Sequence, residues 1–177
     1  MNKVCKLSAL ITLIVTSFFA MPSAYAMDEL DLSVGLKTLA LLDNKISGDV
    51  PLAIIYDPKL PDSEAEAASL HKIITDGFQA PGRLKLSAVM VSVDDLSKLS
   101  SAKVGIVTKG SCTSTVAEAT AHQGILTMTS DLDCVKANRC VLGIISHPSV
   151  QIYLSRSAAD AAKVGFSQAF IMIAEQV

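Results

Sequence analysis

The sequence predicts a single α/β domain with a mostly parallel central sheet, helices on both faces, and a C-terminal antiparallel hairpin followed by a helix. From Leu52 onward, short apolar segments alternate with amphipathic helical segments, which is typical of βαβ units. Near the end of the chain two apolar segments are separated only by Ser146-His-Pro-Ser149, which is typical of a hairpin. Removing a predicted 26-residue leader leaves 151 of the 177 residues, enough for one domain with a sizeable core.

The first 26 residues have the three parts of an export signal. Lys3 and Lys6 form a positive start, residues 7–20 are apolar, and Ala24-Tyr-Ala26 is a small-x-small cleavage motif. The apolar run is too short for a spanning helix. We therefore expect a mature chain, residues 27–177, that begins near Met27 and is exported to the periplasm as a soluble protein, without membrane insertion.

The predicted elements follow one another in a regular order. Leucines at helical spacing, preceded by acidic residues and Ser33, predict a capped helix over residues 29–46. Further strands are predicted at residues 52–56, 84–93, 104–108 and 124–129, and further helices at residues 63–78, 115–122 and 132–137. Strands joined through helices in this way should pair in parallel.

The C-terminal third should form a hairpin and a helix that cover each other. Residues 141–145 and 150–155 are the predicted strands, and Pro148 between them favours a turn because its ring restricts φ. Ser155 or Ser157 can then cap a helix whose apolar positions continue to Val177. Gly165 costs about 1 kcal/mol in a helix interior, so we expect two half-helices or a close-packing point there.

Charge and composition argue against several kinds of partner. Without Lys3 and Lys6, 13 basic residues face 17 acidic ones, which gives a net charge of −4. This balance argues against binding to nucleic acid or to an anionic membrane surface. The absence of Trp and the low aromatic content argue against a platform for stacking sugars.

Three cysteines remain after the predicted cleavage: Cys112, Cys134 and Cys140. In an oxidising compartment a pair of them should be bridged. Cys134 and Cys140 flank a short polar loop, which makes them the predicted pair, with a stabilisation of roughly 2–3 kcal/mol. Cys112 is then buried, reactive, or the true partner of one of the others. No metal site is predicted, since His122 and His147 do not supply ligands at finger-like spacing.

The segment after the strand at 104–108 is the best candidate for a ligand site. Ligands bind at the carboxyl ends of parallel strands, and free amides at a helix start favour an anion. Lys109, Gly110, Ser111 and Thr113 are the candidate ligand-binding residues, although Ser111 or Thr113 could simply cap the helix. The segment matches neither the P-loop nor the dinucleotide pattern. We expect no cofactor.

The sequence contains no catalytic constellation that we can identify. Cys112 and His122 fall at opposite ends of one predicted helix, and there is no G-x-S-x-G elbow. We therefore expect a protein that is not an enzyme.

Several segments resemble the YfiR-like family of small periplasmic proteins. The residues from Ser149 to Ser167 are similar to the family's ending, a strand that closes on a polar residue, then paired alanines, a hydrophobe and a serine. Residues 104–108 and 124–130 resemble the family's two central strands. The resemblance implies a periplasmic regulator that restrains an inner-membrane diguanylate cyclase through its periplasmic sensor domain, and hence cyclic di-GMP signalling.

Two functional classes follow from these patterns. The first is a non-enzymatic regulator that binds a membrane sensor, for which we expect an exposed apolar patch and a homodimer. The second is a periplasmic small-molecule or ion binding protein that serves a transporter or a sensor. For it we expect a pocket around residues 109–115.

Overall fold

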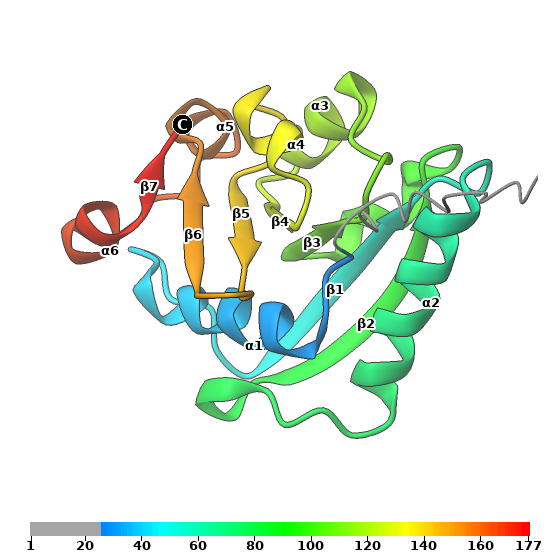
Figure 1. Cartoon of the computed structure of the whole chain (residues 1–177), viewed down its shortest axis with the longest axis horizontal. Coiled ribbons are helices and arrows are strands. Elements are labelled where there is room, and N and C mark those ends of the chain that lie inside the picture. The colour runs from blue at the N-terminus through cyan, green and yellow to red at the C-terminus, as the bar shows by residue number, and fades with distance from the viewer. Residues whose placement is uncertain (1–25) are drawn as a thin grey trace, which may run out of the picture.

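The computed structural model describes residues 26–177 (Figure 1). The predicted export signal therefore lies outside the described residues, apart from Ala26. The strands are β1 (Asp49–Tyr56), β2 (Lys85–Ser92), β3 (Val104–Val107), β4 (Leu126–Thr129), β5 (Leu142–Ile145), β6 (Gln151–Leu154) and β7 (Glu175–Gln176). The α-helices are α1 (Glu29–Thr38), α2 (Pro61–Thr75), α3 (Ser114–His122), α4 (Leu132–Lys136), α5 (Arg156–Ala161) and α6 (Gln168–Ile173). Three 3₁₀ turns, η1 (Leu39–Leu41), η2 (Pro81–Arg83) and η3 (Leu96–Ser101), complete the described elements.

One seven-stranded sheet runs through the molecule in the order β2-β1-β3-β4-β5-β6-β7. The first five strands in this order are parallel to their neighbours. β5 and β6 then form the antiparallel hairpin, and β7 joins β6 in parallel. The predicted α/β class, with a mostly parallel sheet and a C-terminal antiparallel hairpin, is confirmed.

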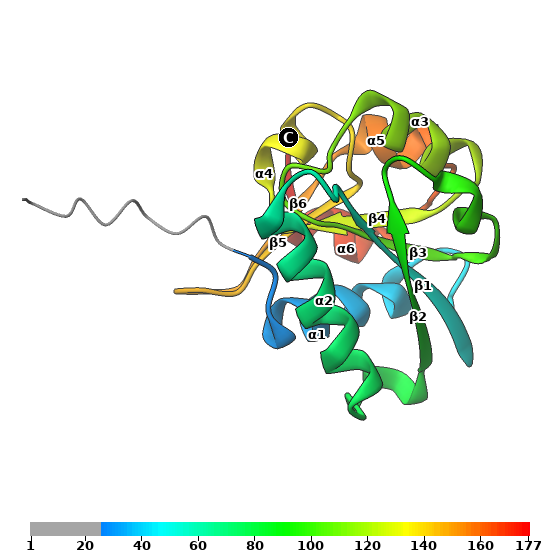
Figure 2. The same cartoon turned by 90° about the vertical axis from the view of Figure 1, so that its right-hand side faces the viewer.

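Alternation along the strands creates two cores, one on each face of the sheet. On β1, Leu52 and Ile54 face a core shared with α1 and α2. Ala53 and Ile55 face the opposite core, which contains residues of η3, α3 and α4. Figure 2 shows α1 and α2 on one side of the sheet and α3 and α4 on the other. Residues 52–55 of β1 are buried on both faces, and this part of the strand is continuously apolar.

The C-terminal segment forms two short helices instead of one long one. Ser155 caps α5, and Ser167 caps α6. Between them Gly165 lies against Asp43, and its carbonyl accepts a hydrogen bond of 3.0 Å from the Asp43 N–H. Phe166 and Phe170 stack with ring centroids 4.6 Å apart. Gly165 therefore lies within the break between the two helices and is a close-packing point. The short edge strand β7 was not predicted.

One helix cap and one helix start differ from the predicted ones for identifiable reasons. Asp28, not Ser33, caps α1 through a capping box with Asp31, because Asp28 is placed to bind the N3 amide. α2 begins at Pro61, earlier than predicted, since proline suits the first helical turn. Within residues 26–177, no helix is long and apolar enough to cross a bilayer.

Candidate functional site

Buried hydroxyl groups hold together the carboxyl ends of β1 and β3. The Ser63 Oγ accepts the Asp57 N–H at 2.9 Å and lies 2.7 Å from the Thr108 Oγ1. The Thr108 hydroxyl donates to the Ile55 carbonyl at 2.9 Å. The Ser111 hydroxyl, fully buried, lies within donating distance of the carbonyls of Ile55 and Thr108, at 3.0 Å and 2.7 Å. These contacts fix the loop after β3 to the end of β1.

The four predicted ligand-binding residues lie in this loop and already have internal partners. Besides buried Ser111, Thr113 caps α3 by accepting the Val116 N–H at 3.1 Å. Gly110 has φ +79° and faces Leu60, a backbone conformation that favours glycine. The Lys109 N–H donates to Glu66 Oε2 at 2.9 Å. Of the two residues that could have capped the helix, Thr113 does so. Ligand binding by the loop remains a prediction.

Glu66 of α2 is a functional-site candidate that the sequence patterns missed. The residue is 6% exposed, and its carboxylate accepts two backbone N–H groups, from Met27 at 2.8 Å and from Lys109 at 2.9 Å. Burial raises the pKa of the Glu66 carboxyl, and nearby Asp131 adds to this, while the two N–H donors and Lys109 act in the opposite direction. The loop after β3, which was predicted to bind an anion, therefore binds the carboxylate of Glu66 through the Lys109 N–H.

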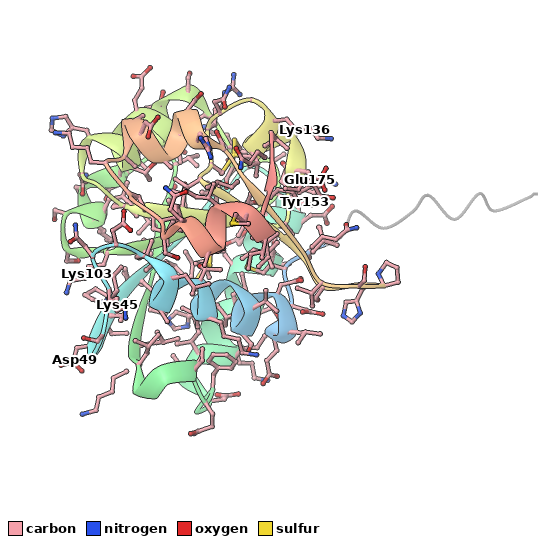
Figure 3. The ribbon with its side chains drawn as sticks, turned by 90° about the vertical axis from the view of Figure 1, so that its left-hand side faces the viewer. Lys45, Asp49, Lys103, Lys136, Tyr153 and Glu175 are labelled. Atoms are coloured by element: carbon pink, nitrogen blue, oxygen red, sulfur yellow. A yellow bond between two sulfur atoms is a disulfide. The ribbon has the colours of Figure 1, made fainter. Side chains whose placement is uncertain are left out.

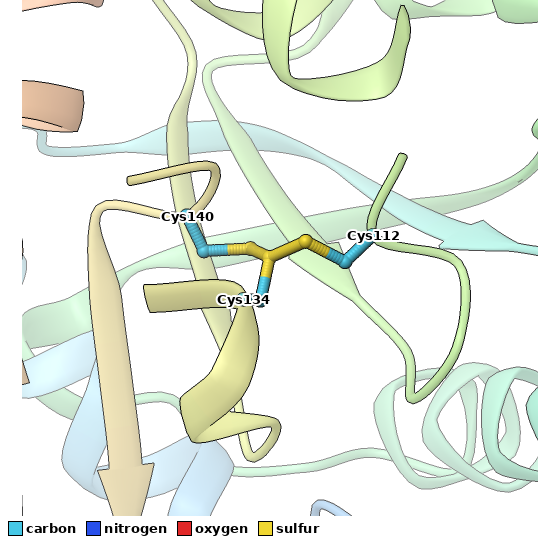
Figure 4. A group of neighbouring side chains, drawn as sticks. All are labelled: Cys112, Cys134 and Cys140. Atoms are coloured by element: carbon cyan, nitrogen blue, oxygen red, sulfur yellow. A yellow bond between two sulfur atoms is a disulfide. The ribbon is translucent and has the colours of Figure 1, made fainter. Parts of the chain in front are cut away.

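The three cysteines form one cluster on the α3–α4 side of the sheet. Their sulfur atoms lie within 4.8 Å of one another. The Cα–Cα distances are 5.8 Å for Cys112 and Cys134 and 5.5 Å for Cys134 and Cys140, both within the usual disulfide range of roughly 4.4–6.8 Å. Figure 4 shows the Cys134 sulfur between the other two. Cys134 is therefore at disulfide distance from both neighbours.

A sulfur atom forms only one disulfide, so Cys134 can be bridged to Cys140 or to Cys112 at any one time. The predicted Cys134–Cys140 bridge is one of these two arrangements, and it remains a prediction. Either bridge leaves one thiol, which is too few ligands for zinc. With all three cysteines reduced, the cluster would offer three soft thiolates to a metal ion.

Three surface cavities lie away from the loop after β3. An open groove of about 1050 Å³ separates the start of α1 from the end of α2, and its lining includes Asp28, Leu30, Lys72, Asp76 and Phe78. Two smaller cavities have volumes of about 180 and 270 Å³. None of the three is lined by a predicted ligand-binding residue.

The hairpin side of the molecule ends in an exposed apolar surface on α6. Met172 is 85% exposed and Ile173 is 71% exposed; we call these two side chains the α6 surface. The adjacent β7 forms the edge of the sheet, where Glu175 pairs with Tyr153 of β6 (Figure 3). Large exposed apolar side chains beside a sheet edge are typical of sites where proteins associate.

The chain is an α/β protein whose fold is shared with a solved structure of low sequence identity. A crystal structure of an ABC domain in complex with L-Trp from Streptococcus pneumonia matches 80% of this chain with a TM-score of 0.54 and 9% sequence identity. This chain covers 58% of that one, so the likeness shows a shared fold over a little more than half of the larger protein. No protein-family model and no curated protein sequence matches the chain.

Proposed function

We propose that this chain is a non-enzymatic periplasmic regulator that binds a membrane sensor protein through the α6 surface. The exposure of Met172 and Ile173 carries the proposal, because burying such side chains against a partner is favourable by about 25 cal/mol per Å² of apolar area. The resemblance to the YfiR-like family supports a diguanylate cyclase as the output of the sensor.

The last elements of the chain give this surface a defined orientation. Phe170, on the same helix, is fully buried and stacks on Phe166. The backbone of Phe166 forms an isolated antiparallel β-bridge with the backbone of Leu42, which follows η1. Because these contacts hold α6 against the core, Met172 and Ile173 are presented on a fixed helix, which lowers the entropy lost on binding.

Site-specific photo-crosslinking in the periplasm tests the proposal. A crosslinker at Ile173 should capture an inner-membrane protein with a cytoplasmic cyclase, and one at exposed Glu118 of α3 should not. The double variant Met172→Ser, Ile173→Ser should fold normally and raise cellular cyclic di-GMP to the level of a deletion strain. Wild-type cyclic di-GMP in that variant, together with equal crosslinking from both positions, would refute the proposal.

The comparison with known structures favours a second candidate, a periplasmic small-molecule binding protein. The matched structure contains L-Trp, and the groove between α1 and α2 combines the charged side chains of Lys72 and Asp76 with apolar Leu30 and Phe78. A free amino acid has both charges and a side chain to bury, so it is the ligand class that fits this lining.

Calorimetry with free amino acids, L-Trp first, tests the second candidate. Saturable binding that is lost in a Lys72→Ala, Phe78→Ala variant would establish it. The α6 variant serves as the matched control, because it should bind the ligand unchanged. Absence of heat for all the amino acids, with a stable fold, would eliminate amino-acid binding in this groove.

A further inference from the structure

We propose that Glu66 is the binding site for the α-ammonium group of the mature N-terminus, created by cleavage between Ala26 and Met27. This inference rests on the proposed export of the chain. The sequence motif and the structure lead to the same residue independently: Ala24-Tyr-Ala26 predicts Met27 as the first mature residue, and the Met27 nitrogen is the atom that contacts Glu66.

Met27 is held like a core residue. The residue is 4% exposed and belongs to the larger hydrophobic core. Its backbone nitrogen donates to Glu66 Oε1 at 2.8 Å across a separation of 39 residues. Asp28, the next residue, caps α1. The nitrogen is therefore positioned from both sides, by the buried side chain and by the first turn of the helix.

Cleavage changes the charge of this nitrogen while its partner stays in place. In the uncleaved chain Met27 contributes an uncharged amide N–H, so the carboxylate of Glu66 is buried with hydrogen bonds but without a cation in direct contact. Lys109 is the nearby cation and Asp131 the nearby anion that act on Glu66. In the mature chain the same nitrogen is an ammonium, and its contact with Glu66 becomes a buried ion pair, which is both charge-assisted and shielded from salt.

Processing would then complete the fold instead of only removing a leader. Before cleavage the carboxylate raises the free energy of the folded precursor, which favours the unfolded form that export requires. After cleavage the ion pair stabilises the folded state and holds α1 against the loop at Lys109. Because cleavage itself generates the ammonium group that pairs with Glu66, the ion pair needs no other change in the structure.

Two chains that differ by one residue test the site. One begins at Met27, and the other retains Ala26, which moves the ammonium one residue away. The urea midpoint at pH 7 should be lower in the chain that retains Ala26. This difference should largely disappear when both chains carry Glu66→Gln. An equal loss in both backgrounds would overturn the proposal.

The reactivity of the terminal amine gives a second readout that needs no variant. An α-amino group normally has a pKa of about 7.7–8.0, and an ion pair with Glu66 should raise it. At pH 7.5 we expect acylation of Met27 to be at least about tenfold slower than acylation of Ala26 in the longer chain. Equal rates would contradict the site even if the Glu66→Gln chains fail to fold.

N-terminal sequencing of the periplasmic protein separates this inference from the export proposal. Met27 as the first residue supports both. A different mature N-terminus, or no periplasmic protein, would refute export as proposed and with it the role of Glu66 in maturation. The two-chain comparison would still report whether Glu66 can bind an ammonium at Met27.

Discussion

Removing single cysteines and then adding a reductant should show that Cys134 takes part in every bridge. Cys140→Ala leaves the pair Cys112–Cys134, with a sequence separation of 22, and Cys112→Ala leaves Cys134–Cys140, with a separation of 6. The chain-entropy relation gives roughly 3.4 kcal/mol for the longer loop and roughly 2.2 kcal/mol for the shorter. Cys134→Ala removes the residue that the two pairs have in common.

The assay is urea unfolding of each variant with and without dithiothreitol. Comparing each variant with its own reduced form cancels the effect of the alanine on packing. The reductant should lower the free energy of unfolding by roughly 3.4 kcal/mol in Cys140→Ala, by roughly 2.2 kcal/mol in Cys112→Ala, and not at all in Cys134→Ala. A loss in Cys134→Ala, or none in the other two variants, would refute the reasoning. Mass spectrometry of the non-reduced, alkylated wild type then identifies the free thiol, which the predicted Cys134–Cys140 bridge places at Cys112.

Three further predictions concern the fold around the site. Ser63→Ala should lower the free energy of unfolding by about 1–3 kcal/mol, because it leaves buried polar partners unsatisfied; urea unfolding measures this. In the uncleaved chain the raised pKa of Glu66 means that its contribution to stability is complete below the usual value of 4.5 and is lost as the pH rises through the raised value. Glu66→Gln should flatten this part of the stability profile, and an unchanged slope would contradict the assignment. Gly143→Ala should cost about 1–3 kcal/mol, since a Cβ there would lie 2.8 Å from Leu132 and 3.0 Å from Val135; a wild-type midpoint would show that α4 can move away.

Local patterns predicted the elements well where each segment carries its own signal. The apolar run at residues 52–56 indicates a strand buried on both faces, and Pro148 marks the hairpin turn. Gly165 indicated the break between α5 and α6 because its cost in a helix depends only on the backbone. The order of strands was not predicted, since a pattern within β2 says nothing about whether its neighbour is β1 or β3.

The candidate site was harder to predict because its contacts join distant segments. Glu66 follows acidic Glu64 on a helix whose pattern suggests a solvated face, and its burial depends on Met27 and Lys109. The cluster around Cys134 depends on β3 and β4 being neighbours, which brings the loop with Cys112 next to α4. In the sequence, the short separation between Cys134 and Cys140 favoured Cys140 as the partner of Cys134. Where two parallel strands are expected to be neighbours, the loops that follow them should be searched together for side chains that could form one site.

The two borders of the sheet differ in length, and this limits how two copies of the chain can join. On one border β2 is paired with β1 over eight residues, and within residues 26–177 no strand pairs with the backbone groups on its other side. On the opposite border β7 has two residues, too few for a stable ladder. A homodimer with a continuous sheet would therefore pair β2 with β2, because only that border offers enough backbone donors and acceptors. Such a dimer would leave α6 at both far ends, so one assembly would carry the proposed α6 binding surface twice.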